Sequence, residues 1–91
     1  METIEELRDF LSKSLPEARI YLFGSRARGD HTVYSDIDIA IEDSSATLSK
    51  RLPLIRFRIE ESKIPYKVDL IDLSKASYLK RIVYKEGIRW Q

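Results

Sequence analysis

Three aspartates lie in stretches of the chain that otherwise have the composition of β-strands. Asp36 and Asp38 flank Ile37 at the start of the run IDIAIE, and Asp69 lies in the middle of YKVDLI. Aspartate is depleted in strands, and a charge near a core is costly unless it is paired or bound to a metal. A spacing of two along a strand puts the Asp36 and Asp38 carboxylates on one face, so both can reach the same ions.

A carboxylate cluster of this kind favours a hard divalent cation. Three carboxylates on one sheet face would repel one another, and Mg²⁺ would relieve that repulsion while keeping waters for a substrate phosphate. The chain has no cysteine and a single histidine, His31, in a loop where we expect it to be exposed, which argues against zinc. The alternative is structural: Asp36 ends a turn, while Asp38 and Asp69 lie on a solvated sheet face.

Gly24 and Ser25 suggest a phosphate site beside these carboxylates. They directly follow a predicted strand, and ten residues separate them from the paired aspartates. A turn or short helix there would aim backbone N–H groups and the Ser25 hydroxyl outward, which suits a phosphate. Arg26 and Arg28 either neutralise a triphosphate in this loop or remain solvated charges. A phosphate-binding turn next to a metal-binding carboxylate pair outlines a nucleotide site.

Apolar periodicity predicts the elements that position these residues. The strands are expected over residues 18–23, 37–42 and 66–71. The helices are expected over 3–14, from 44 or 45 to about 59 with a kink or split at Pro53, and over 75–86. A capping-box pattern, Thr3 with Glu6, begins the first helix, and Pro16 stops it. Ser74 is expected to cap the last helix and Gly87 to end it, with Asp72 as a turn residue before it and a short tail after it. The order α-β-β-α-β-α predicts one domain over residues 1–91, of α/β (α+β) class, with helices packed on a small sheet.

Composition narrows the range of functions. The chain has 91 residues, with 16 basic and 15 acidic side chains and a net charge of +1. This balance gives no basic face for gripping a phosphate backbone, so nucleic acid is not expected as a direct partner. No apolar run reaches the ~18–20 residues of a membrane span, and the acidic, amphipathic N-terminus is unlike a signal peptide. We therefore expect a cytoplasmic protein without a membrane partner.

The compound motif resembles the DNA polymerase β-like nucleotidyltransferase superfamily. The matching residues are Gly24-Ser25, then Asp36-Ile37-Asp38, with Asp69 at the position of the third carboxylate. More narrowly, GSRARGDHTVYSDIDIAI is similar to the minimal nucleotidyltransferases (MNT) that pair with HEPN proteins, and the similarity continues through YKVDLIDL to KEGIRW. The resemblance implies the polymerase β-like nucleotidyltransferase fold, with a small mixed β-sheet flanked by helices.

The resemblance also implies roles for these residues. Gly24 and Ser25 would hold the phosphates of ATP, and Asp36 and Asp38 would bind two Mg²⁺ ions. Asp69 would bind the catalytic ion and help to deprotonate an acceptor hydroxyl. That hydroxyl would attack the α-phosphate and release pyrophosphate, so the chain would be a Mg-dependent nucleotidyltransferase that transfers AMP.

Members of the MNT group commonly act as antitoxins that adenylylate a tyrosine of a HEPN toxin. The resemblance therefore implies a protein adenylyltransferase with a HEPN-type toxin as partner, in a homo- or hetero-oligomer. Two alternatives remain open: a non-catalytic antitoxin that masks its toxin, or an enzyme that modifies an RNA end or a small molecule. Tyr78, Tyr84 and Trp90 near the C-terminus either pack internally or form a partner surface.

Overall fold

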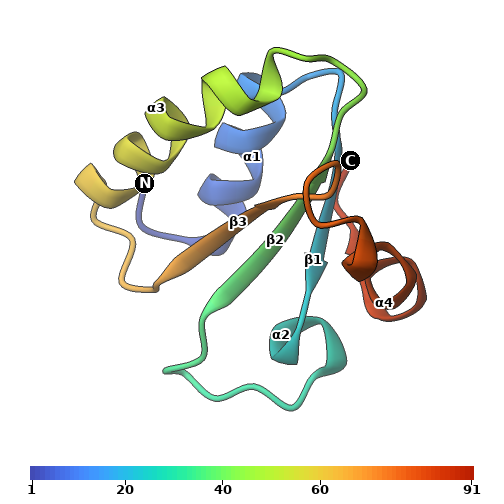
Figure 1. Ribbon diagram of the computed structural model, residues 1–91. Coiled ribbons are helices and arrows are strands. Elements are labelled where there is room, and N and C mark those ends of the chain that lie inside the picture. Colours follow the sequence, from blue (N-terminus) through green and yellow to red (C-terminus); the bar gives the residue numbers. More distant parts are fainter.

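The computed structural model describes all residues 1–91 and places a four-stranded mixed sheet between helices (Figure 1). The strands are β1 (Arg19–Phe23), β2 (Ile37–Glu42), β3 (Val68–Asp72) and β4 (Ile88–Arg89). The helices are α1 (Ile4–Ser14), α2 (Ser25–Arg28), α3 (Leu48–Glu61), the 3₁₀ helix η1 (Ser77–Leu79) and α4 (Lys80–Glu86). None of these helices combines the length and the apolar character that crossing a membrane requires.

The strand order is β3-β2-β1-β4. β1 runs antiparallel to both β2 and β4, whereas β2 and β3 are parallel and are joined by a crossover through α3. This connection follows the rule that parallel neighbours need a long crossover, usually helical. The end of β1 and the beginnings of β2 and β3 therefore meet at one end of the sheet. All the polar residues expected to do chemistry lie near that end.

The main core lies between the sheet and the layer formed by α1 and α3. Ile37, Ile39 and Ile41 are fully buried there, as their alternation in the sequence predicts. Leu7 and Leu11 of α1 pack in the same cluster, together with the buried stripe of α3. A smaller cluster on the other face of the sheet joins Tyr21, Ala40, Leu73 and Val83, so α4 covers part of that face. The end of the sheet that carries the aspartates is left open.

The first helix begins and ends as predicted. The Thr3 hydroxyl oxygen accepts a hydrogen bond from the Glu6 N–H at 3.1 Å, and the Glu6 carboxylate accepts one from the Glu2 N–H at 3.3 Å. These contacts satisfy donors that a helix start leaves free. The helix ends at Ser14 with Leu15 as its C-cap, directly before Pro16.

Some predicted boundaries are wrong. α3 begins at Leu48 rather than at residue 44 or 45, because the preceding residues form turns instead: the Ser45 N–H donates to Asp43 Oδ1 and the Thr47 N–H donates to Ser45 Oγ. The same helix continues through Pro53 without a break; buried residues on both sides of the proline, Leu52 and Ile55, hold it against the sheet. The third strand begins at Val68, not at residue 66.

The C-terminal region also differs from the predicted single helix over residues 75–86. The Ser74 hydroxyl and N–H both donate to Asp72 Oδ1, at 2.7 and 2.9 Å, so this serine closes a turn rather than capping a helix. A 3₁₀ turn then precedes α4. The residues after Gly87 form β4 against β1. With α2 and η1, these additions extend the predicted order α-β-β-α-β-α without changing the fold class.

The sheet core should be the main source of stability in so small a domain. We predict that Ile39→Ala lowers the free energy of unfolding by about 2–5 kcal/mol, because a fully buried side chain is lost and a cavity remains. Val33→Ala is the matched control, since Val33 is 73% exposed and its loss should cost no more than ~0.5 kcal/mol. Urea unfolding followed by circular dichroism measures both, and equal costs would contradict this assignment of the core.

Candidate active site

Two of the three predicted aspartates lie directly opposite each other on neighbouring strands. The parallel register pairs Asp38 of β2 with Asp69 of β3, and Asp36 lies just before β2. Because side chains alternate along a strand, these carboxylates lie on the face opposite the buried isoleucines. The Asp36 and Asp69 side chains are 44% and 41% exposed, so both face solvent at the open end of the sheet.

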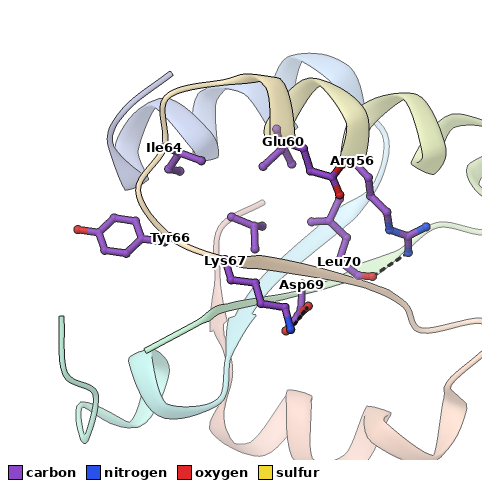
Figure 2. Close-up of a pocket in the computed structure, with 9 residues that line it drawn as sticks. Arg56, Glu60, Ile64, Tyr66, Lys67, Asp69 and Leu70 are labelled. Atoms are coloured by element: carbon purple, nitrogen blue, oxygen red, sulfur yellow. Dashed lines mark hydrogen bonds and ion pairs between the residues drawn. The ribbon is translucent and has the colours of Figure 1, made fainter. Parts of the chain in front are cut away.

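Lys67 lies among these carboxylates. Its Nζ is 4.0 Å from Asp36 Oδ2 and 3.9 Å from Asp69 Oδ1, and the latter contact is visible in Figure 2. The lysine side chain is 71% exposed, and ion pairs of this length and exposure contribute about 0–1 kcal/mol. Lys67 is therefore a weakly held counter-ion that a stronger cation can displace.

The charges around Asp38 leave the site short of positive charge. Burial raises the pKa of Asp38, and the negative charges of Asp69 and Asp36 raise it further. Lys67 and Arg28 act in the opposite direction without reversing the shift. A carboxylate destabilised in this way gains when a cation binds beside it.

Gly24 allows the end of β1 to approach Asp38 closely. Phe23 is paired with Asp38, and the next residue, Gly24, has φ +75° and ψ −155°, a conformation that only glycine adopts readily. A Cβ at this position would collide with the Asp38 carboxylate. The predicted short helix, α2, begins at Ser25, and the first N–H groups of any helix lack intrahelical partners. The phosphate-binding turn predicted from the sequence thus lies against a predicted metal ligand.

The two arginines of this loop are held by the protein. Arg26 Nε donates to the Ser35 carbonyl at 3.1 Å, and its guanidinium lies over the Tyr66 ring, 4.6 Å from the centroid. Its Nη2 is buried and has no hydrogen-bond partner within the chain. Arg28 pairs with Asp30 at 3.3 Å and with Glu86 at 3.6 Å. The arginines fix the loop around α2, and Arg28 is also close enough to lower the pKa of Asp38.

Other residues singled out in the sequence have structural roles or lie apart from the site. Asp72 is buried and closes the turn with Ser74, as predicted. His31 is exposed in its loop, also as predicted. Tyr84 donates its hydroxyl to Glu42 and packs on Tyr21, with ring centroids 5.7 Å apart.

Of the remaining C-terminal aromatics, Trp90 packs partly against the main core, and Tyr78 is 81% exposed.

The sequence prediction missed Lys67 and Tyr66. A signal for Lys67 was present, because a lysine two residues before a strand aspartate shares its face.

The donor set fits a hard cation. All three side chains offer carboxylate oxygens, the ligands preferred by Mg²⁺. Burial raises the pKa of Asp38, and the neighbouring negative charges of Asp69 and Asp36 raise it further. The side chains are not gathered into a coordination shell: nowhere in the chain do three or more Asp, Glu, His or Cys side chains converge closely enough to hold an ion. For these carboxylates to hold an ion together, their side chains would have to move closer and Lys67 would have to leave.

Comparison with known families identifies the class to which this chain belongs. Residues 5–89 match the family described as polymerase beta, nucleotidyltransferase, so the chain belongs to this nucleotidyltransferase family. The four-stranded mixed sheet with its flanking helices is the fold of that family.

Within this family, the chain is similar to proteins named as protein adenylyltransferases and to a toxin–antitoxin structure. The chain is 29% identical over 76 residues to the probable protein adenylyltransferase MntA of Haemophilus influenzae. The aligned residues cover 84% of this chain and 67% of the relative. A Methanocaldococcus jannaschii protein, likewise named as a protein adenylyltransferase, is 37% identical over 81 residues. This alignment covers 78% of this chain and 79% of the relative. Among solved structures, a toxin–antitoxin crystal structure with AMP-PNP superposes with a TM-score of 0.77 at 27% identity, covering 96% of this chain and 71% of the other.

The strained carboxylate gives the first testable prediction from the site. The folded protein binds a proton on Asp38 more tightly than the unfolded chain does, so the charged form lowers stability once the pH exceeds the ordinary value of 3.8. We predict that Asp38→Asn raises the Tm of the metal-free protein by a few degrees at neutral pH. The gain should shrink as the pH falls and vanish below that ordinary value. Asp9→Asn, on the exposed face of α1, is the control. A Tm that is unchanged or lower at neutral pH would contradict the repulsion described above.

A second prediction concerns the approach of Gly24 to Asp38. Gly24→Ala should destabilise the fold by about 1–3 kcal/mol, because it combines an unfavourable backbone conformation with the collision. Part of this cost should disappear in an Asp38→Ala background, where the colliding carboxylate is absent. Urea denaturation of the four proteins of this double-mutant cycle measures the coupling. Strictly additive costs would show that the two residues are not in contact.

Proposed function

We propose that this chain is a Mg²⁺-dependent protein adenylyltransferase that transfers AMP from ATP to a tyrosine of a HEPN-type toxin, and so acts as its antitoxin. The main support is the juxtaposition of Asp38 with Asp69 and with the glycine turn at the end of β1. Membership of the nucleotidyltransferase family supports the reaction type. Relatives named as protein adenylyltransferases support a protein acceptor. The similar toxin–antitoxin structure with AMP-PNP supports both an adenine nucleotide and a toxin partner.

Each residue of the site then has a distinct task. Asp36 and Asp38 hold the metal ions, and the free N–H groups at the start of α2, with the Ser25 hydroxyl, contact the triphosphate. Two bound Mg²⁺ ions supply charge neutralisation for the attacking and leaving oxygens. Asp69 lies beside Asp38, where it can accept the proton of the acceptor hydroxyl.

The reaction is a single displacement at the α-phosphorus. The tyrosine oxygen forms a bond to that phosphorus while the bond to the bridging oxygen breaks, and pyrophosphate leaves. The hydroxyl proton passes to Asp69. Positioning and electrostatic stabilisation provide most of the catalysis in transfers of this kind, which is why a small domain with a few carboxylates can suffice.

Lys67 acts as a counter-ion for the carboxylates within this scheme. Its ammonium lies between Asp36 and Asp69, and a metal ion there would displace it. The released side chain is long and exposed, so it remains available to a phosphate group at the same end of the sheet.

The proposal is tested by labelling. Incubated with Mg²⁺, α-labelled ATP and lysate that contains the toxin, the protein should label one partner protein at tyrosine. Asp36→Asn and Asp38→Asn should each reduce labelling by at least about 10²-fold, the scale of losing one electrostatic stabiliser of a transition state. Asp9→Asn should label normally, and circular dichroism should show that all variants are folded.

Two results would contradict this function. Undiminished labelling by both aspartate variants would remove the catalytic assignment. Formation of an inhibited toxin complex without any transferred label would favour the masking alternative. Labelling of an RNA end or a small molecule in place of protein would keep the enzyme class and change the acceptor.

A further inference from the structure

A groove runs along the outer edge of β3, next to the active site. It has a volume of about 510 Å³ and lies between the C-terminal half of α3 and β3. Figure 2 shows Glu60 and Ile64 on one side of the strand and Lys67 and Asp69 on the other. Asp69 thus belongs to both the groove and the carboxylate site. Any segment lying in the groove would pass directly beside the residue proposed to receive the acceptor proton.

The backbone of β3 has unused hydrogen-bonding groups along this edge. β3 is the last strand on its side of the sheet. The Ile37 N–H donates to the Lys67 carbonyl, and the Leu73 N–H donates to the Ile41 carbonyl, both at 2.9 Å. Alternate residues of a parallel strand bond to the same neighbour, so the backbone groups of Val68 and Leu70 point away from β2.

The side chain of Arg56 supports this orientation. Its Nη2 donates to the Leu70 carbonyl at 2.9 Å from the open side of the strand (Figure 2). One outward group is therefore satisfied within the chain. The Val68 N–H and carbonyl and the Leu70 N–H are left for another strand.

The two faces of β3 offer different surroundings to such a strand. Val68 and Leu70 face the α3 side, where Ile59 and Ile64 provide an apolar floor. Asp69 faces the catalytic side. A strand added at the edge would lie about 4.8 Å from β3, and its side chains would alternate between these two surroundings. The side chain beside Asp69 would point to the catalytic face, with its neighbours in the apolar groove.

We infer that an extended, tyrosine-bearing segment of the acceptor protein binds by adding a strand to the free edge of β3. This inference rests on the proposed function and specifies how the acceptor reaches the site. Strand addition uses main-chain hydrogen bonds for affinity and alternating side-chain pockets for specificity. An extended polypeptide matches the outward N–H and carbonyl groups, which a nucleic-acid backbone does not. The residue on either side of the tyrosine is accordingly apolar.

The structure offers a substitution that blocks only the edge. Proline at position 68 removes an N–H that β2 does not use, and proline is tolerated on edge strands. Val68→Ala is the matched control, because it removes the same side chain and keeps the N–H. We expect Val68→Pro to raise the KM for the labelled protein roughly tenfold or more, with ATP affinity unchanged, while Val68→Ala changes the KM much less.

A binding experiment tests the edge without requiring transfer. The probe is a short peptide of alternating valine and threonine with a central tyrosine, added with Mg²⁺ and an ATP analogue that has a methylene α–β bridge. Amide exchange measured by NMR should slow at Val68 and Leu70, and Val68→Pro should abolish binding. Protection at other amides only, equal binding by the proline variant, or no protection at millimolar peptide would each overturn the inference.

The two proposals fail in distinguishable ways. Transfer to a tyrosine without protection at the edge would overturn strand addition and leave the enzymatic function intact. Edge protection by the peptide with no transfer to any protein would overturn the enzymatic function. Protection that appears without peptide as the protein concentration rises would assign the edge to a second copy and overturn the inference.

Discussion

Electrostatic repulsion among carboxylates held on one face of the sheet is the constraint around which this small domain is built. The parallel register of β2 and β3 fixes Asp38 beside Asp69, and the strand alternation keeps Asp36 on the same face. The backbone positions of Asp38 and Asp69 cannot change without breaking hydrogen bonds of the sheet. Burial and the charges of Asp69 and Asp36 together raise the pKa of Asp38. Charges placed in this way lower the stability of the folded protein, a cost that is typical of functional sites.

The rest of the chain keeps this end of the sheet open while burying the other surfaces. α1 and α3 cover the isoleucine face completely, and α4 covers the other face only around Tyr21, Ala40 and Val83. The loop after α2 is fixed by Arg26, which links Ser35 to Tyr66. Backbone anchored by these contacts therefore borders a polar opening. The position of the carboxylates is set by packing that lies on the far side of the sheet.

Much of this arrangement could be predicted from the sequence because local signals agreed with the final structure. The alternation in IDIAIE correctly placed Ile37 and Ile39 in the core and Asp38 on the other face. The capping residues of α1 were equally clear. The boundaries of α3 were not, because two strong local signals were misleading: Ser45, which closes a turn on Asp43, and Pro53, which tertiary packing tolerates.

The structure brings the predicted aspartates and Gly24 to one end of the sheet, but their contacts could not be predicted from the sequence. The proximity of Gly24 to Asp38 depends on the antiparallel register of β1 and β2, which no local pattern reports. The partners of Arg26 and Arg28 come from residues as distant as Tyr66 and Glu86, so their roles could not be read from spacing. Lys67 was missed because a single lysine just before a strand is unremarkable until its neighbours are known.

The two edge strands of the sheet differ in length, and this difference limits how copies of the molecule can pair through their sheets. A head-to-tail filament of sheets requires two strands on each molecule that are long enough to pair. Here β4 has only two residues, Ile88 and Arg89, and lies at the margin opposite β3. A strand arriving there would find too few backbone partners to remain bound. The short β4 therefore disfavours a filament in which copies of the molecule pair edge to edge through both sides of the sheet.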